Sequence, residues 1–189
     1  MYNTEKYIEI IENALSEYRF HHSMCVAEKA EELAKKHGLN AEKAYIAGVL
    51  HDITKEMPYD EQCRLIEENG HTLTEAELAN KRVLHQMSGA AYVKNVLGIT
   101  DGEILGGIRY HTTGRANMMV FEMIIYLADF TSADRSYPDV EVMRAETEKG
   151  LFSGMLYSLR HTIVSVASEN RTLHPDTVHC YNWVLNNLK

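Results

Sequence analysis

The sequence has few of the residues that build β-rich or disulfide-bonded proteins. It holds only 3 prolines and 11 glycines among 189 residues, which suits helices better than a fold with many β-turns. Its three cysteines, Cys25, Cys63 and Cys180, lie far apart and form no CxxC pair. These features argue against a disulfide framework or a cysteine-rich zinc site and favour a reducing cytoplasm.

Positive charge is scarce as well. Lysine and arginine number 19 against 27 acidic residues, which gives a net charge of −8. This balance argues against binding to nucleic acid or to an anionic membrane, although it is compatible with a local basic pocket for a small phosphate compound. The acidic N-terminal segment lacks the apolar core of a signal peptide, and no apolar run reaches the ~18 residues of a membrane span. We therefore expect a cytoplasmic protein.

Apolar residues recur at helical spacing along most of the chain, and no alternating segment of convincing length appears. We predict an all-α fold of about nine or ten helices, with residues 1–189 forming a single domain. The irregular segments are expected around residues 71–84, 112–117 and 131–139. The predicted helices lie near residues 4–18, 22–38, 40–53, 59–70, 85–98, 100–111, 117–132, 151–170 and 175–188.

Histidine is abundant, with ten residues in the chain, and helical geometry indicates which of them face the core. His22 shares a helical face with Val26 and Ala30, whereas His21 lines up with Cys25 on a more polar face. We therefore predict that His22 points inward and His21 points toward solvent.

Other histidines and aspartates end apolar segments. His51 and Asp52 project from the buried side of the helix AYIAGVLHD, His111 continues an apolar stripe, and His85 precedes the next helical face. Asp129 ends the run MIIYLAD, where an unpaired ionised carboxylate would be very costly and a bound cation would offset the cost. One such histidine alone is more often a hydrogen-bonded core residue than a ligand. The ordered set predicts a metal site suited to iron, manganese or zinc.

Two further segments carry groups suited to phosphate. Lys55 lies one turn after His51, so its ammonium is expected to reach phosphate oxygens beside the metals. The segment HTTGR adds two hydroxyls, a flexible glycine and a forked guanidinium. A solvated lysine and a surface arginine are the alternative interpretations. We assign substrate binding to Lys55, Thr112, Thr113, Gly114, Arg115 and Arg135.

The pattern H…HD…H…H…D between residues 22 and 129 resembles that of the HD-domain metal-dependent phosphohydrolases. The resemblance extends to the bacterial YqeK-type branch, which comprises symmetrical diadenosine tetraphosphate hydrolases. It covers residues 15–188 and places the core of the metal site roughly within residues 18–135. The segments that carry it are RFHHSMCVAEKAEELA, AGVLHDITK, LHQMSGAAYV, IRYHTTGR, YLADF and HPDTVHCYNWV.

The resemblance implies two divalent metal ions, with iron as the expected metal and manganese or another divalent ion as alternatives. One metal would be held by His22, His51, Asp52 and Asp129, and the second by Asp52, His85 and His111. Asp52 would therefore bridge the two metals, and it is assigned a catalytic role together with Lys55.

The implied reaction is the cleavage of diadenosine tetraphosphate into two ADP molecules by attack of a metal-bound hydroxide on an inner phosphorus. The partner would be a small nucleotide, and a homodimer is left open. Three alternatives are another HD-type nucleotide phosphohydrolase or phosphodiesterase, an HD-type oxygenase, and a nucleotide-binding sensor without activity. The complete set of six ligands disfavours the sensor.

One segment departs from the family pattern. After the last metal aspartate, relatives of this type carry a Glu-Pro-x-Arg-like stretch, whereas this chain has Ser132 and Ala133 in the first two places and keeps Arg135. We expect any role of the missing acid to be weakened or to pass to Asp134.

Overall fold

The computed structural model describes residues 2–188, and all regular structure in that range is helical. This confirms the predicted all-α class. The helices are α1 (Thr4–Ala14), α2 (Glu17–Lys36), α3 (Ala41–Leu50), α4 (Tyr59–Glu68), α5 (Glu75–Ala79), the short 3₁₀ helix η1 (Lys81–Val83), α6 (Leu84–Asn95), α7 (Gly102–Tyr110), α8 (Val120–Thr131), α9 (Val140–Lys149), α10 (Leu151–Ser168) and α11 (Pro175–Asn187).

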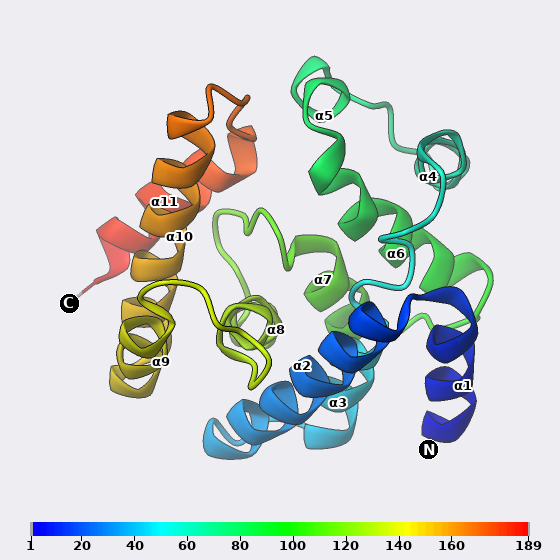
Figure 1. Ribbon diagram of the computed structural model, residues 1–189, viewed down its shortest axis with the longest axis horizontal. Helices are drawn as coiled ribbons and strands as arrows, with labels where there is room; N and C mark the ends of the chain where they lie inside the picture. Colours follow the sequence, from blue (N-terminus) through cyan, green and yellow to red (C-terminus); the bar gives the residue numbers. More distant parts are fainter. Residues whose placement is uncertain (1, 189) are drawn as a thin grey trace.

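Helix α8 lies near the middle of the molecule, and several of the other helices pack against it (Figure 1). It contacts α2 and α3 on one side, α7 on another, and α9 and α10 on a third. The run from Phe121 to Ala128 is almost completely buried, which explains why this segment is so apolar. Its last turn carries Asp129 out of this core, toward the side where the ends of α3 and α7 lie.

Helices α2 and α3 form the closest pair. Gly48 permits their approach, since a Cβ built at Gly48 would lie 2.5 Å from the Cα of Ala27. This contact brings the start of α2, with His22, close to the end of α3, with His51.

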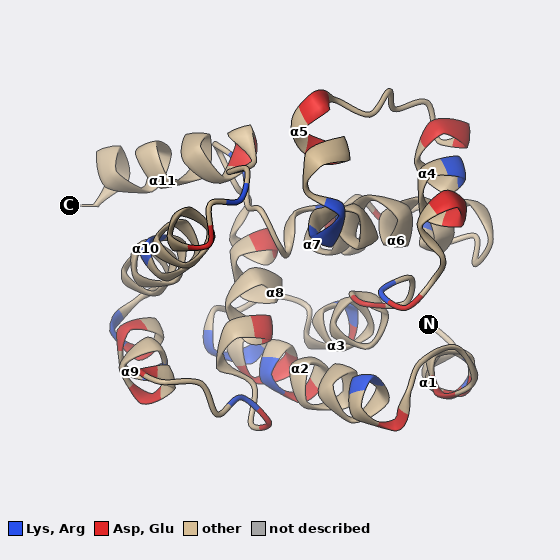
Figure 2. Ribbon diagram, turned by 45° about the horizontal axis from the view of Figure 1, so that its top comes forward, with Lys and Arg blue, Asp and Glu red and all other residues tan. Residues whose placement is uncertain are grey.

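Charged residues are sparse on two of the helices near the centre, α6 and α8. Figure 2 shows α6 and α8 as mostly uncharged ribbons, whereas α4 and α9 carry charges along much of their length. Among residues 2–188, no helix combines the length and apolarity needed to cross a bilayer.

Besides the short η1, two α-helices lie in segments for which no helix was predicted. Helix α5 falls inside the expected loop 71–84; it is only five residues long and is set by a capping box between Thr74 and Glu77. Helix α9 directly follows the expected loop 131–139, and its charged sequence gave no clear apolar stripe. Helix α8 begins at Val120 rather than near residue 117, because Asn117 has a φ of 57°.

Candidate metal centre

Six side chains from five helices converge between α2, α3, α6, α7 and α8. His22 lies in the second turn of α2, His51 and Asp52 directly follow α3, and His111 directly follows α7. His85 lies in the first turn of α6, and Asp129 lies in the last turn of α8. All are between 0 and 2% exposed except Asp129, whose side chain is 17% exposed. The structure thus brings together His22, His51, Asp52, His85, His111 and Asp129.

The four imidazoles form a row. Their ring centroids lie 5.3 Å apart from His22 to His51, 5.0 Å from His51 to His111, and 4.9 Å from His111 to His85. His21 is exposed, so the predicted orientations of the two neighbouring histidines are confirmed.

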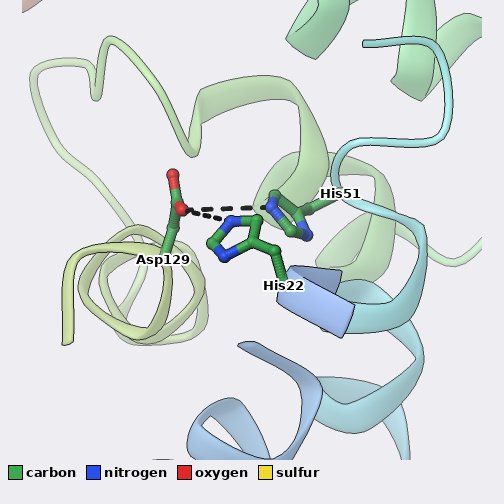
Figure 3. A group of neighbouring side chains, drawn as sticks. All are labelled: His22, His51 and Asp129. Atoms are coloured by element: carbon green, nitrogen blue, oxygen red, sulfur yellow. Dashed lines mark hydrogen bonds and ion pairs between the residues drawn. The ribbon is translucent and has the colours of Figure 1, made fainter. Parts of the chain in front are cut away.

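The two carboxylates occupy different places along this row. Asp52 lies at its middle: its Oδ2 is 3.6 Å from His51 Nε2, and its Oδ1 is 3.1 Å from His85 Nε2 and 3.6 Å from His111 Nε2. Asp129 lies at one end, with its Oδ1 3.0 Å from His22 Nε2 and 4.0 Å from His51 Nε2 (Figure 3). Of the two carboxylates, Asp52 is therefore the one that faces both halves of the row, His22 with His51 and His111 with His85.

Each imidazole is fixed through its Nδ1, which leaves its Nε2 directed toward the centre. Three rings bond the carbonyl three residues earlier: His51 bonds Gly48 at 2.7 Å, His85 bonds Arg82 at 2.8 Å, and His111 bonds Ile108 at 2.7 Å. With Nδ1–H as the donor, each Nε2 carries a lone pair, which is the form of histidine that binds metals.

His22 is held by a carboxylate instead. Its Nδ1 lies 2.8 Å from Asp134 Oδ2, while the Ser132 hydroxyl donates to Asp134 Oδ1 at 2.7 Å. Burial alone would raise the pKa of Asp134, but the Ser132 and His22 contacts lower it below its usual value. The segment that departs from the family pattern therefore supplies an acid to His22 from position 134.

Basic side chains offset the charge of the two central carboxylates. Burial would raise the pKa of Asp52, but His51 and Lys55 hold it well below its usual value, and Arg19 Nη1 bonds Asp52 Oδ2 at 2.9 Å. Burial acts likewise on Asp129, whose pKa is held well below its usual value chiefly by Arg135. Both carboxylates are therefore ionised at neutral pH.

Burial also keeps two of the imidazoles neutral. It lowers the pKa of His51 to about 4 and that of His85 to about 3. His51 Nε2 and Asp52 Oδ1 are buried without a hydrogen-bond partner among the described residues. These two neutral imidazoles, the ionised carboxylates and the two ligand atoms without a hydrogen-bond partner together fit a divalent cation. Two overlapping triads, His22–His51–Asp129 and His51–Asp52–His111, have their ligand atoms within 4.8 Å of one another.

A cavity of about 260 Å³ opens beside the cluster. Lys55, Thr112, Thr113 and Asp129 line it, so three of the predicted substrate-binding residues face the same space. Lys55 Nζ is 3.0 Å from His85 Nε2, and Thr112 Oγ1 lies 3.1 Å from the same nitrogen.

The other predicted substrate-binding residues have different contacts. Arg115 donates to the buried carboxylate of Glu122, with Nη2 3.0 Å from Oε1, and lines no cavity beside the cluster. Gly114 packs against Cys180, where a Cβ would lie 2.7 Å from the sulfur. Arg135 donates to the carbonyl and carboxylate of Asp129. The roles of these three residues in substrate binding stay predictions.

Sequence reasoning gave no role to several residues around the cavity. His161 and His174 line it, and Gln86 accepts from the backbone N–H of Thr112 and Thr113. None of these had a recognisable spacing signal. Arg19, which the sequence offers as a weaker candidate for binding phosphate, precedes His22 by three residues and shares its helical face, and it donates to Asp52.

Four imidazoles and two carboxylates thus meet in one cluster inside an all-helical core. This is the architecture of a helical metal-dependent hydrolase. The chain belongs to the HD domain family, whose model matches residues 19–134. Membership confirms the resemblance drawn from the sequence and implies dependence on a divalent metal.

Similar proteins extend the match over nearly the whole chain. The chain is 36% identical over 185 residues to the symmetrical bis(5'-nucleosyl)-tetraphosphatase of Halalkalibacterium halodurans, with 97% of each chain covered. It is 33% identical over 186 residues to a protein of the same name from Bacillus subtilis, with 97% of this chain and 98% of the relative covered. A crystal structure of a predicted HD superfamily hydrolase involved in NAD metabolism, from Clostridium acetobutylicum, matches with a TM-score of 0.96 at 32% identity and covers 100% of both chains.

Proposed function

We propose that the protein is a metal-dependent hydrolase that cleaves diadenosine tetraphosphate symmetrically into two ADP molecules. The observation that carries this proposal is the position of Asp52, whose two oxygens face opposite halves of the histidine row. Relatives that share about a third of their residues over nearly their full length bear the name of this activity.

The ligand assignment follows the two halves of the row. His22, His51 and Asp129 would hold one metal, His85 and His111 the other, and Asp52 both. When bound, two divalent ions lower the pKa of water and offset the negative charge of the phosphates. The mixed nitrogen and oxygen donors suit iron, which we propose as the metal, and also manganese.

The remaining residues of the site act on the substrate. Lys55 and Thr112 line the cavity next to His85, so the ammonium and the hydroxyl are placed to bind phosphate oxygens. The reaction consumes one water: its oxygen bonds to an inner phosphorus, the central P–O–P bond breaks, and one ADP leaves with the bridging oxygen.

We further propose that residues 1–189 act as one HD-type domain in a reducing cytoplasm. The main hydrophobic core runs from Tyr7 in α1 to Val184 in α11, beside a small second cluster of Ile66, Leu84 and Met87, and its extent supports a single folding unit. The three cysteines are unpaired, which supports a reducing compartment.

The test is metal analysis of anaerobically purified protein followed by product analysis with diadenosine tetraphosphate, ATP, a cyclic dinucleotide and NAD. We expect two metals per chain and ADP as the only product from diadenosine tetraphosphate, without added oxygen. Asp52→Ala should abolish ADP formation and leave the helical circular dichroism intact. The control variant Asp60→Ala, at an exposed position, should still form ADP. ADP formation by Asp52→Ala, or an AMP and ATP product pair, would refute the proposal, and nucleotide binding without turnover would favour the sensor.

A further inference from the structure

A second cavity lies on the other side of Lys55. It measures about 520 Å³ and is lined by Arg19, Lys55, Gln62, Lys81, Arg82 and His85. Lys55 and Arg82 line both cavities, so the two spaces adjoin along these two side chains. The first cavity touches the cluster at Asp129 and the second touches it at His85, which are opposite ends of the histidine row.

The second cavity is strongly cationic. Four of its six lining residues are lysine or arginine, and no carboxylate lines it among the described residues. This is unusual in a chain with a net charge of −8. The Arg82 side chain is 72% exposed and lies 3.8 Å from a carboxylate oxygen of Glu169, while the Lys81 ammonium lies 4.0 Å from the centroid of the Tyr59 ring. These charges are therefore available to a polyanion.

The first cavity has a different character. Its far wall is formed by α10 and the loop before α11, with the apolar side chains of Val166 and Leu173 beside the imidazole of His161 and the hydroxyl of Ser165. Apolar surface with a few polar groups suits a nucleoside better than a chain of phosphates.

We propose that the substrate straddles the cluster, with one nucleoside in the first cavity and the phosphates of the other half in the second. This inference rests on the proposed function and adds a structural reason why the cleavage would be symmetric. The tetraphosphate would cross between the cavities over Lys55 and Arg82, so its central anhydride would lie beside Asp52 and both halves would leave as ADP.

The experiment compares the whole substrate with one of its halves in the metal-loaded enzyme. Lys81→Met removes a charge from the second cavity alone, and Arg82→Met removes one that both cavities share. The two changes are made alone and combined, and both side chains are exposed, so the fold is retained. The double variant should raise KM for diadenosine tetraphosphate about tenfold or more, since charge-assisted contacts of this kind are each worth roughly that factor. The Ki of ADP, which needs only the first cavity, should change less than about threefold in Lys81→Met, because Lys81 lines the second cavity alone whereas Arg82 lines both.

Two controls make the result decisive. Arg64→Met removes an exposed charge from α4 outside both cavities and should leave KM unchanged. Metal content should be equal in all variants, and the rise of KM with salt should be weaker in the double variant than in the wild type. For Lys81→Met, a KM within about twofold of wild type, or a rise in the Ki of ADP equal to the rise in KM, would overturn the inference. A wild-type enzyme that holds metal but leaves diadenosine tetraphosphate intact would instead refute the proposed function, and this inference with it.

Discussion

Replacing Gly48 with alanine should force α2 and α3 apart. The new Cβ would lie 2.5 Å from Cα and 2.8 Å from N of Ala27, and 3.1 Å from the carbonyl carbon of Val26. Carbon atoms in contact normally lie roughly 3.5–4.0 Å apart, so the helices would have to separate by about 1 Å. The obstructing atoms belong to the backbone and cannot rotate away.

The cost can be estimated from two opposing effects. Overpacking of a core costs roughly 1–3 kcal/mol, and the backbone obstruction places this case at or above the upper end. Alanine recovers about 1 kcal/mol through its higher helix propensity. The net loss of about 2 kcal/mol corresponds to a fall in Tm of about 4–8 °C for a chain of this size.

Thermal unfolding of the metal-stripped protein, followed by circular dichroism, measures this effect. Gly102→Ala is the matched control, because a Cβ at Gly102 meets no atom of residues 2–188 within 4 Å. The Gly48 carbonyl holds the His51 ring, so Gly48→Ala should also weaken metal binding. A Gly48→Ala protein whose Tm matches that of Gly102→Ala would refute the packing argument.

Three further predictions concern the surroundings of the cluster. Asp134→Ala removes the acceptor of the His22 Nδ1–H and should weaken metal affinity about 10- to 100-fold in chelator competition. A metal affinity equal to that of the wild type would contradict this prediction. Arg115→Ala leaves the buried Glu122 carboxylate without its guanidinium and should cost about 2 kcal/mol in urea unfolding, whereas a raised KM at unchanged stability would favour the phosphate role. The metal-free protein should lose stability as the pH falls below about 6.5, because unfolded His51 then binds a proton that the folded ring, with a pKa of about 4, does not. The loss should reach about 2 kcal/mol at pH 5 and shrink in His51→Gln, and a urea midpoint that is the same at pH 7.5 and pH 5 would contradict it.

The positions of most helices, and which of their side chains point toward the core, could be predicted from the sequence because both depend on local geometry. The apolar stripe that buries His22 also turns His21 outward. For Asp129, burying an ionised carboxylate without a partner is costly in any helical packing, so a partner could be expected. The family pattern then joined residues that lie far apart in the chain, which local geometry alone does not do.

The contacts around the cluster were less accessible because they join distant segments. Nothing local in HTTGR shows that Arg115 turns toward Glu122, since that requires the position of α8. The basic second cavity likewise collects Arg19 from α2 and Lys81 from η1, which are 62 residues apart in the printed sequence. Helix α5 is too short for a periodic pattern to reveal.

The place of each histidine within its helix explains why His22 needs Asp134. His51 and His111 follow the last residues of α3 and α7, where carbonyls such as those of Gly48 and Ile108 have no donor within the helix and can accept from Nδ1. His22 lies inside α2, where the carbonyl three residues earlier already accepts from the helix backbone. An acceptor for its Nδ1–H must therefore come from elsewhere, and Asp134 supplies it across 112 residues of sequence. Helix geometry thus requires an acceptor near this point in space, and here the carboxylate of Asp134 in the loop after α8 fills that place, next to the serine and alanine at positions 132 and 133.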